Sequence, residues 1–153
     1  MIASPARDVV RLPPSAVSVR TARAAVTAAL ERWHVDGVDG TAALLVSELA
    51  TNVLLHAHTD FEVRTERRDG HVRVTVLDDS PRLPARRHYG LDAGTGRGLG
   101  LVAAMSSRWG VEEGPAPWQK SVWFELPDHA DELDAPLEGA LYGEDWLAMV
   151  EEP

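Results

Sequence analysis

The chain has 153 residues, of which 44% are hydrophobic and 25% charged, a composition typical of a soluble globular protein with one core. Because it has no cysteine, disulfides, a thiolate nucleophile and a cysteine zinc site are excluded. The net charge of −9 belongs to the C-terminal end, because residues 127–153 hold nine acidic residues and no lysine or arginine. This balance argues against binding to nucleic acid. No apolar run is expected to reach the roughly 20 residues of a membrane span, and the N-terminus lacks the apolar centre of a signal peptide, so we expect a cytoplasmic protein without a membrane partner.

The first predicted elements are an edge strand and two helices. The strand lies at residues 9–13 and is stopped by Pro13 and Pro14. The first helix has Ser15 or Ser18 as its N-cap and ends near residues 34–37. Its apolar side chains recur at helical spacing, at Val19, Ala22, Val26, Leu30 and Trp33. The second helix, Thr41 to Ala57, is almost wholly apolar, so we expect it to be buried on more than one side.

Beyond the second helix, the sequence predicts a β-hairpin, a loop, a helix and two more strands. The hairpin has strands at 61–67 and 71–77, and its valines at positions 72, 74 and 76 share one face. The later elements are a loop over 78–98, a helix over 99–109 and strands over 109–113 and 121–127. This order predicts an α/β (α+β) two-layer sandwich, with helices on one face of a mostly antiparallel sheet.

The second helix carries one polar stripe, formed by Glu48, Asn52 and His56 at positions i, i+4 and i+8. Glu48 is its only charged residue, and burial of an unpaired carboxylate costs several kcal/mol. One interpretation is that Glu48 lies at the edge of the buried face and meets water or an arginine from another element. The other is that Glu48 lies beside a cleft as a general base, with Asn52 as an oxygen ligand for Mg²⁺.

Two further stretches have properties of a nucleotide site. Asp78 ends a valine-rich strand, where a carboxylate can accept hydrogen bonds from the amino group of adenine. Taken alone, Asp78 is better explained by turn formation before Pro81. The sequence "GTGRGLGLV", Gly94 to Val102, leads glycine backbone into a helix, and free N–H groups at a helix N-terminus bind anions such as phosphate. It matches neither the dinucleotide fingerprint nor the P-loop, and a flexible hinge is the alternative.

The order of these signals resembles that of the GHKL (histidine-kinase-like, Bergerat-fold) ATPase superfamily. "ELATNVLLHA" is similar to its N box, "DDSPRLP" to its first glycine box and "GTGRGLGLV" to its second. The resemblance implies a Bergerat fold with a mixed, mostly antiparallel sheet, and ATP and Mg²⁺ as cofactors. It makes Glu48 the catalytic base, Asn52 the Mg²⁺ ligand and Asp78 the adenine-reading carboxylate. The other implied nucleotide-binding residues are Ser80, Gly94, Thr95, Gly96, Arg97, Gly98, Leu99, Gly100 and Ser121.

Within that superfamily, residues 17–126 resemble the small anti-sigma factor serine kinases and related bacterial regulatory proteins. This likeness implies an ATP-binding regulatory protein with protein serine/threonine kinase activity that acts by partner switching between a sigma factor and an antagonist. A non-catalytic module that sequesters a partner is the alternative, because Ser80 and Arg82 stand where glycines are usual in the first glycine box. A self-contained ATPase is a third reading, and the sequence leaves a homodimer open.

The sequence divides into a GHKL-type ATP-binding domain over 1–126 and an acidic tail over 127–153. In the tail, Leu133, Leu137 and Leu141 repeat every four residues and Trp146 follows, which favours a part-helical segment that docks on the domain or on a partner. A solvated tail is the alternative. The spacing of His56 and His58 does not fit a zinc site.

Overall fold

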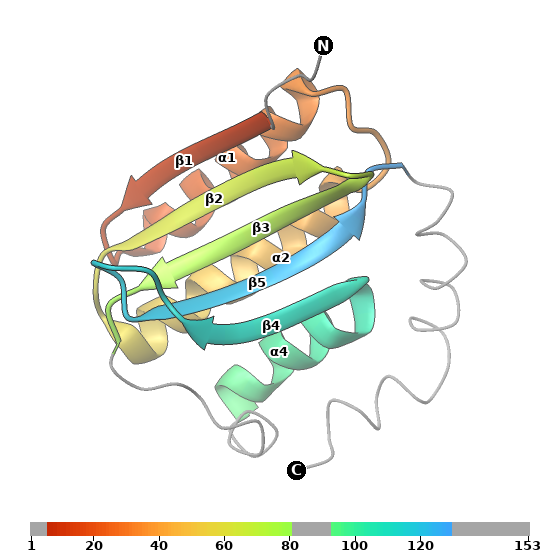
Figure 1. Cartoon of the computed structure of the whole chain (residues 1–153). Helices are drawn as coiled ribbons and strands as arrows, with labels where there is room; N and C mark the ends of the chain where they lie inside the picture. The colour runs from red at the N-terminus through yellow and green to blue at the C-terminus, as the bar shows by residue number, and fades with distance from the viewer. Residues whose placement is uncertain (1–5, 81–92, 130–153) are drawn as a thin grey trace.

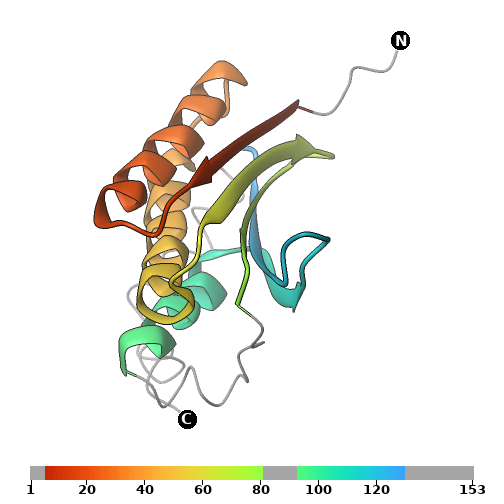
Figure 2. The same ribbon diagram turned by 90° about the vertical axis from the view of Figure 1, so that its left-hand side faces the viewer.

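The computed structural model describes residues 6–80 and 93–129, and for residues 93–98 the backbone alone. The elements are β1 (Ala6–Leu12), α1 (Ala16–Arg32), α2 (Asp39–Asn52), the π-helix η1 (Val53–Ala57), β2 (Phe61–Arg68), β3 (His71–Asp78), α4 (Ala93–Met105), β4 (Arg108–Glu113) and β5 (Lys120–Pro127) (Figure 1). The helices cover one face of the sheet (Figure 2). The predicted two-layer α+β sandwich is therefore confirmed.

The sheet has the strand order β1-β2-β3-β5-β4, and each of the four pairings among these strands is antiparallel. The predicted hairpin is formed by β2 and β3. Its turn consists of Asp69 and Gly70, whose φ angles of 53° and 80° fit a two-residue turn that follows the twist of the strands. As predicted, β1 is an edge strand that ends before Pro13, and among the described strands it pairs with β2.

The core lies between the sheet and the helix layer. The alternating valines of β3 share one face, as predicted, and that face lies toward the helices, as do alternate residues of β5. From α1, the side chains of Ala22, Val26 and Leu30 are fully buried, which confirms the apolar stripe. The core residues of the two central strands are Val72, Val74, Val76, Val122, Phe124 and Leu126.

The helical span Asp39–Ala57 begins two residues earlier than we expected from the sequence. Its 19 residues, with a mean hydropathy of 1.2, pass the length and composition test for a membrane span, which corrects the expectation that no run approaches that length. In the fold, this span is the helix that lies behind β3 and β5 (Figure 1). Its side chains Leu45, Val46 and Leu49 belong to the core, so the apolar composition is explained by packing.

The start of α4 differs from the prediction. We expected a loop as far as Gly98, but the helix begins at Ala93 and includes the glycines at 94, 96 and 98. Each glycine costs a helix about 1 kcal/mol, yet its backbone adopts helical angles freely, so a helix anchored at Leu99 and Val102 extends through them. The helix also ends at Met105 rather than near Trp109, because Arg108 to Glu113 pair with β5.

The other face of the sheet carries charged and aromatic side chains. The Arg73 guanidinium lies 3.9 Å from the ring centre of Trp123 and is 2.8 Å from a carboxylate oxygen of Glu125. Trp123 donates a hydrogen bond of 2.6 Å to Glu112. At Gly110 an added Cβ would lie 2.8 Å from the Trp123 ring, so only glycine leaves room for it. This face is therefore held by its own ion pairs and stacking contacts.

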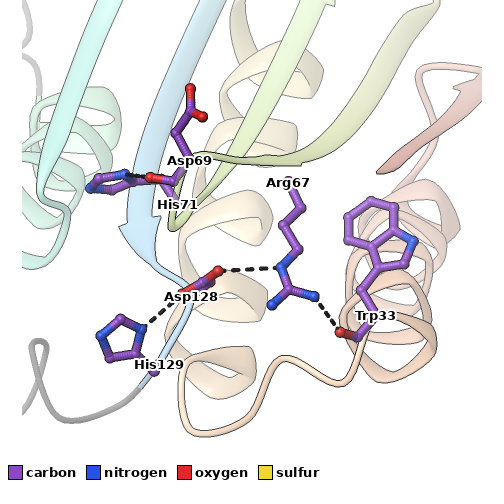
Figure 3. A network of polar contacts seen from close by, with 6 residues as sticks. All are labelled: Trp33, Arg67, Asp69, His71, Asp128 and His129. Carbon is purple, nitrogen blue, oxygen red and sulfur yellow. Dashed lines mark hydrogen bonds and ion pairs between the residues drawn. The ribbon is translucent and has the colours of Figure 1, made fainter. Parts of the chain in front are cut away.

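The end of β5 is fastened by a polar network around Asp128, shown in Figure 3. Arg67 donates to Asp128 over 3.3 Å and to the carbonyl of Trp33 over 2.6 Å, which links β2 to the C-terminus of α1. The Asp128 carboxylate also lies 2.8 Å from Nδ1 of His129, and its backbone N–H donates to the carbonyl of Gly70. The pKa of Asp128 is lowered mainly by the hydrogen bond with His129. Burial of the carboxyl group acts in the opposite direction and raises the pKa, whereas Arg67 lowers the pKa further.

This lowered pKa predicts a pH-dependent contribution to stability. A carboxyl group whose pKa is lower in the folded chain stabilises the fold above its unfolded pKa, and this contribution is lost as the pH falls through the folded pKa. We expect Asp128→Asn to lower the free energy of unfolding by about 1 to 2 kcal/mol near neutral pH, with the difference shrinking as the pH falls below the ordinary aspartate pKa of 3.8. Urea titrations across this range measure the difference. The control Asp69→Asn, in the exposed turn, should show none, and a pH-independent loss for Asp128→Asn would contradict the ionic origin.

Candidate functional site

A pocket opens between the helix layer and the sheet, where α2 ends, β3 ends and β5 begins. It is narrow, with a cavity volume of about 10 Å³, room for about one water molecule. In Figures 1 and 2 the end of β3, η1 and the first turns of α4 lie at the same end of the molecule. The lining residues are Leu49, Asn52, Val53, Val76, Asp78, Leu99, Lys120 and Val122. Two of the predicted polar residues, Asn52 and Asp78, thus share one mainly apolar pocket.

Glu48 and Asn52 lie one turn apart on α2, and both are half-buried. The side chain of Asn52 lines the pocket, whereas Glu48 is not among the lining residues. In the described part of the chain, neither side chain makes a hydrogen bond or ion pair with another residue. The arginine partner that one interpretation gave Glu48 is therefore not found there, and both polar groups are available to solvent or to a ligand.

Immediately after Asn52 the helix changes its winding. The backbone N–H of His58 donates to the carbonyl of Val53 over 3.0 Å, the i to i+5 bond of a π-helix, and His58 then ends the helix with a φ of 57°. Such widened turns occur often at functional sites. Here the turn ends the polar stripe: His56 is exposed and does not line the pocket.

Asp78 lines the pocket and is almost fully buried. Its Oδ1 accepts the backbone N–H of Ser80 over 2.8 Å, which is the turn contact expected of an aspartate before Ser-Pro. Its Oδ2 lies 3.3 Å from Nζ of Lys120. Asp78 therefore closes the turn, as one interpretation expected, and its side chain also lines the pocket. Ser80 is itself buried beside it.

Lys120 is a site residue that the sequence reasoning missed. It pairs with Asp78 across β3 and β5, and its side chain is only 9% exposed. Two signals in the sequence were available. Lys120 is the only lysine among 15 basic residues, and it lies at even spacing from Val122, Phe124 and Leu126, which face the core. A lysine in such a position is rarely buried without a partner.

Ser121, which the family resemblance placed beside adenine, is not brought into this pocket. It is paired with Leu77, and successive side chains of a strand point to opposite faces of the sheet. Since Lys120 and Val122 line the pocket, Ser121 lies on the face away from the helices. The polar side chain that β5 contributes at this point is therefore that of Lys120.

The glycine-rich stretch forms the beginning of α4. Gly94, Gly96 and Gly98 lie in its first turns, where the first N–H groups of a helix have no intrahelical partner and can bind an anion. Leu99 follows and lines the pocket, and Gly100 is half-buried behind it. The side chains of Thr95 and Arg97 lie outside the described part of the structure, as do Arg82 and the leucines and tryptophan of the acidic tail.

The donor set suits a magnesium ion that arrives with a phosphate ligand. Within residues 6–80 and 93–129, no three His, Asp or Glu side chains are grouped as a free-standing metal site. The Asn52 amide is the unpaired oxygen donor of the pocket, and Mg²⁺ is commonly held by one or two protein oxygens together with phosphate oxygens and water. Asn52 therefore fits a Mg²⁺ ion that is bound together with a nucleotide.

Comparison with known families gives one result for this chain. The model of the family described as histidine kinase-like ATPase domain matches residues 12–124, from the last residue of β1 to the middle of β5. This range contains α2, Asp78, the glycine-rich start of α4 and Lys120. A comparison with curated proteins gave no match.

Proposed function

Because the chain belongs to the histidine kinase-like ATPase domain family, an ATP-binding family, we propose that it is a regulatory protein with serine/threonine kinase activity. The observation that carries the proposal is the shared pocket, which brings the Asn52 amide and the Asp78 carboxylate together beside the start of α4. In this arrangement the pocket widens to admit the base of ATP, which then lies against Asp78. The triphosphate then runs toward the N-terminus of α4, where helix N–H groups attract negative charge.

The proposed chemistry assigns one task to each group. Glu48, one turn before Asn52 and free of protein partners in the described chain, accepts the proton of a serine hydroxyl. The hydroxyl oxygen bonds to the γ-phosphorus as the bond from that phosphorus to the leaving ADP oxygen breaks. Asn52 would hold Mg²⁺, and the bound ion would supply positive charge opposite the phosphates. The N–H groups at the start of α4 hold the phosphate oxygens in place.

We further propose that the phosphorylated protein is an antagonist and that the regulated partner is a sigma factor, in a cytoplasmic partner switch. This assignment rests on the resemblance of the motifs to anti-sigma factor serine kinases. Phosphorylation of the antagonist would release it and leave this chain free to bind the sigma factor. Incubation with a candidate antagonist and labelled ATP tests the assignment directly, because label must appear on a serine or threonine of the antagonist.

A non-catalytic binding module is the second candidate, and one observation favours it. Both oxygens of Asp78 already have protein partners, Ser80 and Lys120, so the carboxylate meets a base only if it shares these contacts. A chain of this kind would keep the family fold and sequester a partner without transferring phosphate. ATP binding combined with an absence of transfer to any acceptor would identify this function.

Titration with ATP and Mg²⁺ by calorimetry tests the common premise. We expect magnesium-dependent binding, and we expect Asn52→Ala to weaken it by about 10- to 100-fold, because the metal loses its protein ligand. His56→Ala is the matched control: it lies on the same helical stripe but is exposed and outside the pocket, so its affinity should equal that of the wild type. Binding that is indifferent to Mg²⁺, or equal in both variants, would contradict the assignment of Asn52.

A further inference from the structure

We propose that Lys120 takes part in recognition of the purine base. Lys120 donates one hydrogen bond to the base, and Asp78 beside it accepts another. This inference rests on the proposed ATP site and names a residue of that site that the motifs do not include. If Lys120 has this role, the base must carry a hydrogen-bond acceptor on its Watson–Crick edge. This acceptor must lie next to the amino group that donates to Asp78.

The geometry places the donor and the acceptor side by side. Asp78 and Lys120 are direct partners in the pairing of β3 with β5, and both side chains line the same pocket. Nζ of Lys120 lies 3.3 Å from Oδ2 of Asp78, and the two side chains are 9% and 2% exposed. A ligand that reaches one of these groups therefore lies within reach of the other.

Lys120 has more hydrogen-bond donors than its protein contacts use. An ammonium group has three N–H donors, and within the described residues Asp78 is its one polar partner. With so little of the side chain exposed, water can satisfy few of the remaining donors, and unsatisfied buried donors are costly. A ligand acceptor placed in the pocket would satisfy one of them.

The edge of adenine matches this pair. Its 6-amino group is a donor that a carboxylate accepts, and the neighbouring N1 is an acceptor that an ammonium group can reach. Asp78 alone would recognise only the amino group. With Lys120 beside it, the pair recognises both positions and keeps its charges balanced, because the ion pair persists in the bound state.

The experiment compares ATP with 1-deaza-ATP, in which N1 is replaced by C–H, on the wild-type protein and on Lys120→Met. We expect calorimetry to show the wild type binding ATP about 10- to 100-fold more tightly than the deaza analogue, the loss expected for a hydrogen bond to a charged group. In Lys120→Met the two affinities should be nearly equal. The ratio within each protein is the readout, so a general loss of affinity or stability in the variant does not affect it.

Because Lys120 is the only lysine, a second measurement needs no substitution. In protein labelled with ¹⁵N-lysine, one side-chain ammonium signal is expected, and ATP should shift it more than 1-deaza-ATP does.

Equal affinities of the wild type for both nucleotides, or an unchanged preference in Lys120→Met, would overturn the assignment of Lys120 while leaving the ATP site intact. A failure of the wild type to bind ATP at all would instead overturn the proposed function, and this inference with it.

Discussion

Asp78→Asn is expected to weaken ATP binding by about 10- to 100-fold and to lower the free energy of unfolding by about 3 kcal/mol. The first effect follows because an amide replaces the carboxylate that accepts a hydrogen bond from the amino group of the base. The second follows because Lys120, only 9% exposed, loses its counter-charge and is left as a buried cation in the pocket. Calorimetry with ATP and urea denaturation measure the two effects separately.

Two further variants separate recognition from stability. Asp79→Asn is the matched control, because Asp79 is adjacent but exposed, and its side chain accepts a hydrogen bond from Gln119 on the surface. It should change both quantities little. In the double variant Asp78→Asn with Lys120→Met, both charges are removed, so much of the stability should return while the affinity for ATP stays low. Recovery of ATP affinity in the double variant would show that Asp78 does not read the base.

Glu48→Gln is expected to slow phosphoryl transfer by about 10²- to 10⁴-fold and to leave ATP affinity close to that of the wild type. Glutamine keeps the size of the side chain but cannot accept the serine proton. Affinity should persist because Glu48 does not line the pocket, whereas Asn52 one turn later does. The measurement is the rate of label transfer from γ-labelled ATP to a candidate antagonist, and to water in the absence of an acceptor.

The control for this variant is Glu31→Gln, an exposed glutamate near the end of α1, on a different helix from Glu48. It should transfer phosphate at the wild-type rate. A Glu48→Gln protein that transfers phosphate normally would refute the base assignment. A wild-type chain that binds ATP but transfers phosphate to neither acceptor would favour the sequestering module instead.

The sequence alone predicted most of the fold, because its signals are local. The valines at 72, 74 and 76 alternate within a single strand, and the dipeptide Asp69-Gly70 is itself typical of a tight turn. Both the strand and the turn can therefore be predicted without information about distant residues. The three motifs are also contiguous stretches, and their order along the chain was sufficient to indicate the family that the comparison then found over residues 12–124. The boundaries of α4 were wrong, since glycine propensity is a weak guide beside tertiary packing.

The composition of the pocket was decided by tertiary structure. Asp78 and Lys120 are separated by 42 residues and meet only because β5 lies between β3 and β4, an order that no local pattern specifies. The same register turns Ser121 to the opposite face, although the motif alone placed it beside the base. Side-chain period shows which residues of a strand share a face, whereas the pairing of strands decides what those residues meet. The sequence thus determined the family and the elements, and the sheet register determined which charges share the pocket.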